Sequence, residues 1–115
     1  MRDDPLTFAV TSGQSPNTRV YRLQGPLTLS NIFDLQTALS GATQPVTVLD
    51  LTDAPYMDST GLGAILTLYV SAKRRGCLIQ LVGVNHRIAL MLELTKADSL
   101  IKTYPSIEAA ERDMV

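Results

Sequence analysis

Two adjacent side-chain hydroxyls, Ser59 and Thr60, follow the carboxylate of Asp58 at the point where a predicted strand gives way to a predicted helix. The first turn of a helix has unpaired backbone N–H groups and a partial positive charge, which favour an oxygen acceptor or an anion. One chemistry open to these residues is simple capping, in which one of the three accepts from the first-turn amides. Gly61 and Gly63 favour a second interpretation, because glycines leave the backbone and the hydroxyls open to close approach by another molecule.

Local patterns define the elements on either side of this junction. Residues 46–51 are β-branched or apolar apart from Asp50, which is typical of a strand covered on both faces. Downstream, apolar residues at three- and four-residue spacing predict a helix with one buried face: Leu62, Ile65, Leu66 and Tyr69. Three cations at 73–75 and then Gly76 predict the end of this helix, because cations favour its carbonyl end and glycine favours a left-handed cap.

The rest of the chain alternates strand-like and helix-like runs. Residues 6–10 and 20–23 predict two strands, and the turn-rich stretch at 12–17 favours a hairpin between them. After Gly25-Pro26 we expect a helix that stops at Gly41 and carries Leu29, Ile32, Phe33, Leu35 and Leu39. Further strands are expected at 77–82 and at Leu100-Ile101, with one helix between them and a last helix after them.

Alternating strands and helices require crossover connections, which build a largely parallel sheet. The first strand is the expected antiparallel exception. We therefore expect an α/β sandwich, with a mixed, mostly parallel sheet of about five strands and about four helices mainly on one face. The length fits a single domain over residues 1–115, of which residues 1–4 are expected to be flexible.

Composition limits the class of partner. The formal net charge is −1 and the ten basic residues are scattered, so no basic stripe is available to follow a nucleic-acid backbone. No apolar run approaches the roughly twenty residues that span a bilayer, and the N-terminus lacks a signal-peptide core. We expect a cytoplasmic protein with no nucleic-acid partner and no membrane insertion. Cys77 is interpreted as a small buried hydrophobe and His86 as a surface residue in the first turn of a helix.

Three carboxylates near one strand end support a competing hypothesis, a metal-assisted phosphoryl-transfer site resembling that of response-regulator receivers: Asp50, Asp53 and Asp58. Such a site needs an acid pair at the end of the first parallel strand, and Gln24-Gly25 supplies none. We favour Asp50 as a hydrogen-bonded strand residue and Asp53 as part of a turn with Pro55. No nucleophile, base and orienting acid can be assembled, so we expect no enzyme activity, no metal and no cofactor.

The segment Met57-Asp58-Ser59-Thr60-Gly61-Leu62-Gly63 resembles the Asp-Ser-Ser/Thr-Gly-Leu signature of STAS domains, the sulfate-transporter and anti-sigma factor antagonist family. Three further segments are similar to that family: the preceding strand at 48–51, the next helix at 85–95 and the closing helix at 106–110. The resemblance extends from about Leu6 to the end of the chain. It implies the STAS sandwich fold and a protein of the anti-sigma factor antagonist branch.

In that branch the second hydroxyl of the pair is phosphorylated by the partner kinase, which implies Thr60 as the acceptor and Ser59 as the alternative. The unmodified domain would bind an anti-sigma factor kinase of the ATP-binding serine/threonine type and release a sigma factor in a bacterial stress response. Phosphorylation would end this complex, and a metal-dependent serine/threonine phosphatase would restore it. The expected partner-binding residues are Tyr56, Met57, Asp58, Ser59, Thr60, Gly61 and Leu62. For Tyr56 and Met57, packing of the loop against the core is the alternative.

One departure from the family pattern concerns the partner. Antagonists usually carry an acid in a Gly-Glu-Leu-Asp-like stretch after the second strand, whereas this chain reads Gly25-Pro26-Leu27-Thr28. Thr28 can still cap the following helix, but a contact from that acid to a basic residue of a partner is missing. Family members also serve as scaffold pieces of stress-signalling assemblies and as small subunits of lipid transporters. A constitutive assembly subunit, never phosphorylated, is therefore the alternative function.

Overall fold

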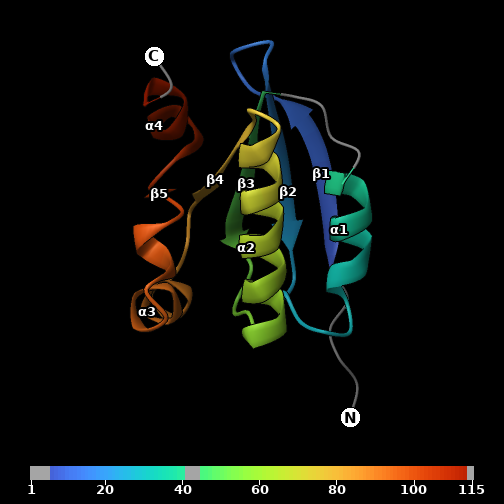
Figure 1. Cartoon of the computed structure of the whole chain (residues 1–115), viewed down its shortest axis with the longest axis vertical. Helices are drawn as coiled ribbons and strands as arrows, with labels where there is room; N and C mark the ends of the chain where they lie inside the picture. The colour runs from blue at the N-terminus through green and yellow to red at the C-terminus, as the bar shows by residue number, and fades with distance from the viewer. Residues whose placement is uncertain (1–5, 41–44, 114–115) are drawn as a thin grey trace.

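The computed structural model describes residues 6–40 and 45–113, which form a five-stranded sheet flanked by helices (Figure 1). In chain order the elements are β1 (Thr7–Ser12), β2 (Thr18–Gln24), α1 (Ile32–Ser40), β3 (Val46–Asp53), α2 (Ser59–Arg74), β4 (Leu78–Val82), α3 (His86–Leu94), the short 3-10 helix η1 (Ala97–Ser99), β5 (Thr103–Tyr104) and α4 (Ile107–Arg112). No helix in the described ranges is long and apolar enough to cross a membrane.

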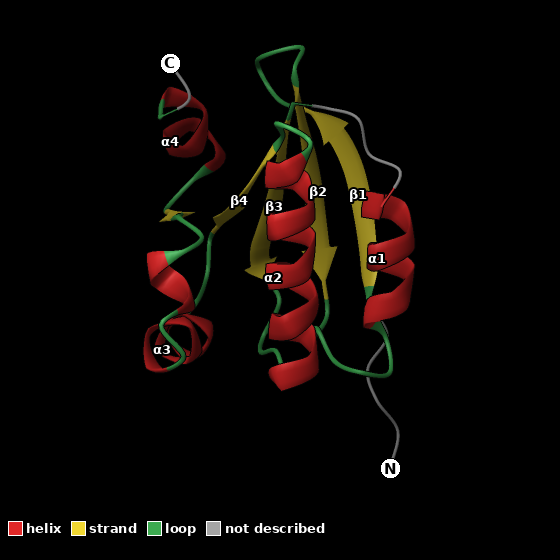
Figure 2. Cartoon of the chain, in the orientation of Figure 1, coloured by secondary structure: helices red, strands yellow, loops and turns green. Residues whose placement is uncertain are grey.

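The strands lie in the sheet in their sequence order, β1-β2-β3-β4-β5 (Figure 2). Strands β1 and β2 form an antiparallel hairpin, in which Thr7 pairs with Gln24 and Ser12 with Arg19. All later neighbours are parallel. Each parallel connection moves one position along the sheet through a helix, as crossover connections require. The mixed, mostly parallel sheet expected from the sequence is therefore confirmed.

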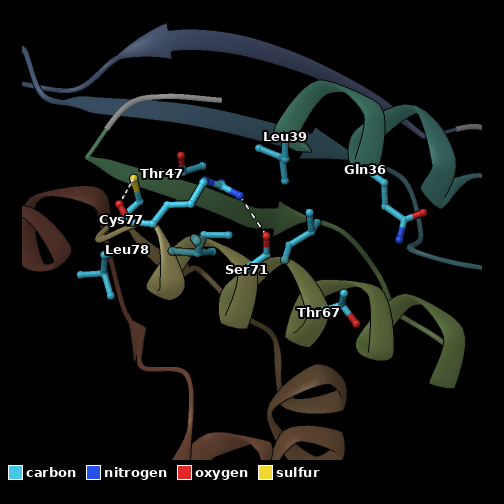
Figure 3. Close-up of a pocket in the computed structure, with 11 residues that line it drawn as sticks. Gln36, Leu39, Thr47, Thr67, Ser71, Cys77 and Leu78 are labelled. Atoms are coloured by element: carbon cyan, nitrogen blue, oxygen red, sulfur yellow. Dashed lines mark hydrogen bonds between the residues drawn. The ribbon is translucent and has the colours of Figure 1, made fainter. Parts of the chain in front are cut away.

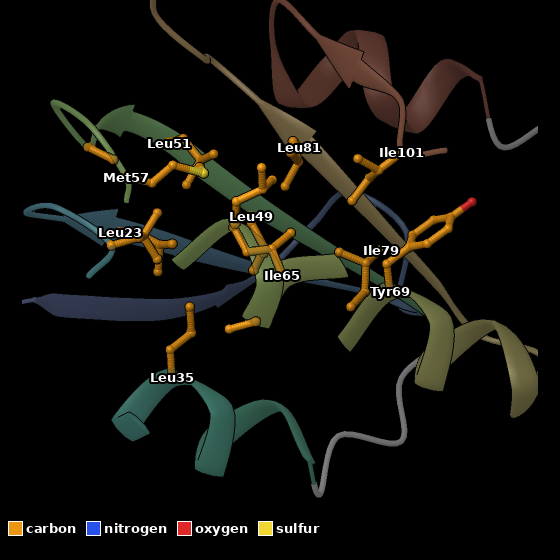
Figure 4. Packing of buried hydrophobic residues seen from close by; sticks show 14 of the residues in the cluster. Leu23, Leu35, Leu49, Leu51, Met57, Ile65, Tyr69, Ile79, Leu81 and Ile101 are labelled. Atoms are coloured by element: carbon orange, nitrogen blue, oxygen red, sulfur yellow. The ribbon is translucent and has the colours of Figure 1, made fainter. Parts of the chain in front are cut away.

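The main core lies between the sheet and the helices α1, α2 and α3, and Figure 4 shows part of it. Alternate residues of β3, Leu49 and Leu51, point to this side and are fully buried. Leu35 of α1 and Ile65 of α2 pack onto them and are fully buried as well. The first turn of α2 is thus held against the sheet by the helix's own apolar stripe.

The opposite face of the sheet carries a smaller cluster under α4. Val20, Val48 and Val82 pack there against Ala110. Gln80 is buried on β4 and its Nε2 donates to the Ala110 backbone oxygen at 3.4 Å. Three helices therefore cover one face and the last helix covers the other, which confirms the expectation that the helices lie mainly on one face.

Four local predictions were wrong. Leu100-Ile101 is not a strand: Leu100 is exposed and Ile101 is buried beside η1, while β5 begins at Thr103. Leu29 does not belong to α1, which begins at Ile32, and its side chain is 58% exposed; Phe33 lies on α1, as expected, with a side chain that is 60% exposed. The hydroxyl of Thr28 does not cap α1 but lies 3.1 Å from the Ser30 hydroxyl, and the Thr28 backbone oxygen accepts from the Ile32 amide. Cys77 is only partly buried.

The expected stop at Gly41 and the expected flexibility of residues 1–4 lie outside the described residues.

Candidate functional site

Asp58 caps the N-terminus of α2. Its backbone is extended, with φ −94° and ψ −179°, and its Oδ1 accepts from the Gly61 amide at 2.8 Å. Its backbone oxygen accepts from the Leu62 amide at 3.0 Å, which opens the helical hydrogen-bond ladder. The capping interpretation of the junction is confirmed for Asp58. This leaves the two hydroxyls without a capping role.

Ser59 and Thr60 are the first two residues of α2, and both are exposed. Neither hydroxyl has a hydrogen-bond partner within residues 6–40 and 45–113, and the same holds for their two backbone amides. The amides are the unpaired donors that every helix start presents, so this corner favours an anion. An accessible hydroxyl pair on a positively polarised helix start is the chemistry of this site.

A second loop, which connects β2 to α1, is joined to the same corner. The Asp58 amide donates to the Leu27 oxygen at 3.0 Å, and the Leu27 amide donates to the Tyr56 oxygen at 3.1 Å. The second carboxylate oxygen of Asp58 accepts from the Leu29 amide at 3.2 Å. One side chain therefore binds amides on two segments, and the two loops form a short parallel bridge at Leu27 and Met57.

The contact between these two loops requires a glycine at position 61. A Cβ at Gly61 would lie 2.2 Å from the Leu27 backbone oxygen, so the missing side chain makes room for the backbone of Leu27. The expectation that Gly61 gives clearance to another molecule is therefore wrong. Gly63 fits that expectation, because it is exposed and a Cβ there would meet nothing within 4 Å.

The expected partner-binding residues divide into exposed and buried ones. Met57 and Leu62 belong to the core, with 6% and 5% of their surface exposed, and Gly61 is buried as well. Tyr56 is half-buried, and the guanidinium of Arg87 on α3 lies 4.9 Å from the centre of its ring. For Met57 the structure favours the alternative, packing of the loop against the core. Between Tyr56 and Gly63, the exposed residues are Ser59, Thr60 and Gly63, and Tyr56 and Asp58 are half-buried.

Asn85 ties a third element to the site, which the sequence interpretation missed. Its Oδ1 caps α3 by accepting from the Ile88 amide at 2.8 Å. Its Nδ2 donates to the backbone oxygens of Ala54 and Pro55 at 3.2 and 3.0 Å. An asparagine before a helix is a recognisable capping signal, but its contacts 30 residues back along the chain depend on the tertiary fold.

The three carboxylates of the competing hypothesis do not converge. Asp50 accepts from the Thr52 amide at 3.0 Å and from the Thr52 hydroxyl at 2.6 Å. Asp53 ends β3 with an exposed side chain, and its backbone oxygen accepts from the Gly25 amide. Within the described part of the chain, no group of three or more His, Cys, Asp or Glu residues is arranged to hold a metal ion. His86 begins α3 and is exposed, as expected.

The geometry of the signature segment agrees with a comparison of the whole sequence to protein families. The model of the STAS domain matches residues 9–110. This chain belongs to the STAS domain family. The match takes in β2 to β5 and α1 to α3 in full, most of β1 and part of α4, so the resemblance based on residues 57–63 extends to nearly the complete fold.

Similar proteins include several antagonists of anti-sigma factors. The anti-sigma-B factor antagonist of Listeria monocytogenes is 35% identical over 54 residues, 47% of each protein. This STAS domain thus matches about half the length of that relative.

The crystal structure of an anti-sigma factor antagonist from Mycobacterium paratuberculosis has a TM-score of 0.83 at 19% identity, covering 94% of this chain and 92% of that chain. The Bacillus cell fate determinant SpoIIAA in its phosphorylated form has a TM-score of 0.71 at 17% identity, with coverage of 92% and 98%. At these identities the structural likeness establishes the fold.

Proposed function

We propose that this STAS domain is an anti-sigma factor antagonist that binds an anti-sigma factor through the start of α2 and is switched off by phosphorylation of Thr60. The observation that carries the proposal is the exposed hydroxyl pair, which has no partner among the described residues, on a helix start that three loops hold in place. Names of relatives support it, because the Listeria and Mycobacterium proteins are called antagonists. The Bacillus protein SpoIIAA adds that a chain of this fold occurs in a phosphorylated form.

The surface around the hydroxyls suits a protein partner. Leu29, whose amide is bound by Asp58, presents a side chain that is 58% exposed. Exposed apolar side chains beside a few hydroxyls are typical of the centre of a protein interface, where charges are depleted. Ser59 and Thr60 would donate and accept hydrogen bonds there in their neutral form. The expected partner is an anti-sigma factor kinase of the ATP-binding serine/threonine type, which releases its sigma factor when this domain binds.

Phosphorylation would act on binding without unfolding the domain. A phosphate on Thr60 adds about −1.5 to −2 charges, and the helix start stabilises an anion by about 0.3–1 kcal/mol. This offsets repulsion from the Asp58 carboxylate, and the exposed position of Thr60 needs no repacking. In the complex the dianion must lose its water, and a penalty of about 3–4 kcal/mol would weaken association by two to three decades. A metal-dependent serine/threonine phosphatase would restore the active form.

The first test is a phosphorylation assay followed by intact-mass spectrometry. The purified protein is incubated with ATP and the kinase fraction from its own source, alongside the variants Thr60→Ala and Ser59→Ala. Thr67→Ala is the matched control, because Thr67 is an exposed threonine on the same helix. We expect one added phosphate on the wild type, Ser59→Ala and Thr67→Ala proteins, and none on Thr60→Ala.

Two results would contradict this assignment. A phosphate retained by Thr60→Ala but lost from Ser59→Ala would make Ser59 the acceptor. Absence of any phosphate with every kinase fraction would favour the constitutive assembly subunit, in which the hydroxyl loop contacts another protein without modification.

A further inference from the structure

A cavity of about 280 Å³ lies between α1 and α2, at the opposite end of α2 from the hydroxyl pair (Figure 3). Its floor comes from the first residues of β3 and β4, and its sides come from the facing surfaces of the two helices. The lining residues are Gln36, Leu39, Thr47, Thr67, Leu68, Ser71, Ala72, Arg75, Cys77, Leu78 and Ile79. The volume is close to the lower end of the range for small-molecule sites, about 300–1,000 Å³.

Part of the wall is apolar. Leu39 of α1 faces Leu68 and Ala72 of α2, and Ile79 of β4 contributes to the floor. Leu39, Ala72 and Ile79 are each at least nine-tenths buried, so this surface is part of the packed interior. Such walls favour the hydrocarbon part of a small ligand, because water gains little from contact with them.

Thr47 places one polar group on the floor. Its residue is 5% exposed, yet its hydroxyl has no hydrogen-bond partner among the described residues. A hydroxyl that no protein group binds is free to donate to, or accept from, a ligand atom that enters the cavity. Thr47 lines the cavity, so a ligand oxygen is well placed to satisfy this hydroxyl.

Arg75 supplies positive charge at the mouth. One of its guanidinium nitrogens donates to the Ser71 hydroxyl at 2.9 Å, and both residues line the cavity. Within residues 6–40 and 45–113, no carboxylate lies within 4 Å of this guanidinium. Arginine binds carboxylates through two parallel N–H donors, so its free donors suit a ligand carboxylate.

From these groups we infer that the cavity between α1 and α2 binds a small carboxylic acid with a short apolar body and a hydroxyl at its far end. The carboxylate pairs with Arg75, the hydrocarbon packs between Leu39 and Leu68, and the hydroxyl bonds to Thr47. The site is separate from the phosphorylation corner and does not depend on the function proposed for it.

The test is a titration of the full chain followed by amide chemical shifts, with ω-hydroxyhexanoate, hexanoate and hexanol as the three probes. We expect saturable shifts at the amides of Thr47, Ser71, Arg75 and Cys77, and tighter binding of the hydroxy acid than of hexanoate. The variant Arg75→Gln should weaken binding of both acids about tenfold, which corresponds to about 1.4 kcal/mol. Arg74→Gln is the matched control and should change affinity less than twofold, because Arg74 is adjacent but does not line the cavity.

The variant Thr47→Val separates the hydroxyl contact from the charge contact, and it should abolish the preference for the hydroxy acid over hexanoate. Cys77 gives a second readout, because it is the only cysteine and lines the cavity. A bound acid should slow its alkylation by iodoacetamide with the same saturation. The inference is overturned if hexanol binds as well as hexanoate, if the two arginine variants behave alike, or if the shifts rise linearly without saturation.

Discussion

Gly61 and Gly63 lie two residues apart on α2, and the same substitution to alanine should have opposite effects on stability. A Cβ at position 61 would lie 2.2 Å from the Leu27 oxygen, about 1 Å inside ordinary contact distance. This atom is backbone and accepts from the Asp58 amide, so it cannot move without disturbing the joint between the two loops. A Cβ at position 63 would point into open space.

Overpacking of this kind costs about 1–3 kcal/mol, and a weakened hydrogen bond between Asp58 and Leu27 adds about 0.5–1.5 kcal/mol. Alanine stabilises a helix by about 0.5–1 kcal/mol relative to glycine, which offsets part of this loss. We therefore expect Gly61→Ala to lower the free energy of unfolding by about 2 kcal/mol and Gly63→Ala to raise it by about 0.5–1 kcal/mol.

Urea unfolding monitored by circular dichroism measures both changes, and an unchanged dependence on urea confirms that the two variants fold alike. The two midpoints should move in opposite directions from the wild type. If Gly61→Ala matched or exceeded the wild type in stability, the close contact between α2 and Leu27 would not exist, and the account of how the hydroxyl pair is positioned would be wrong.

Two further predictions concern other parts of the structure. Asp58→Ala should lower the free energy of unfolding by about 1–2 kcal/mol. Asp58→Asn should lower it less, because the asparagine Oδ1 still accepts from the Gly61 amide, although its Nδ2 cannot accept from the Leu29 amide. Equal losses of the two variants in urea unfolding would refute the double role of this carboxylate. Burial and a hydrogen bond to Asp113 raise the pKa of Tyr104, so the unfolded chain loses this proton first and stability should fall as pH rises above about 10. Tyr104→Phe should lack that component of the alkaline loss, and identical pH profiles for the two proteins between about pH 9 and 11 would contradict it.

The ends of α2 could be predicted from the sequence because local chemistry determines them. Asp58 caps the start, and Gly76 takes φ +75° after the last turn. The Gly76 amide donates to the Lys73 oxygen and the Cys77 amide to the Ala72 oxygen, which is the pattern expected of a glycine-terminated helix. These contacts span only a few residues, so the residue types specify them.

The role of Gly61 could not be predicted in the same way. Its neighbour is Leu27, 34 positions earlier in the chain, and the bridge between Leu27 and Met57 forms only when two separate loops meet. A glycine beside two hydroxyls favours clearance for a partner when only the sequence is considered, whereas the tertiary structure uses the space for its own backbone.

The last strand was misplaced for a different reason. Leu100 and Ile101 are adjacent apolar residues, and so short a run does not distinguish a strand from a turn beside a core. Ile101 is fully buried beside η1, and the two-residue strand β5 begins only at Thr103, where the chain reaches Leu81 and Val82 of β4. The position of β5 therefore depends on the tertiary path of the chain after α3.

The central claim is that a neutral Thr60 allows an anti-sigma factor to bind and that a phosphate on Thr60 prevents it. The most direct measurement is the Kd of the purified pair, obtained by calorimetry before and after stoichiometric phosphorylation of this domain. We predict that the Kd rises by two to three decades while thermal unfolding of the free domain changes little. A Kd that stays within about twofold of its starting value after phosphorylation would contradict the account.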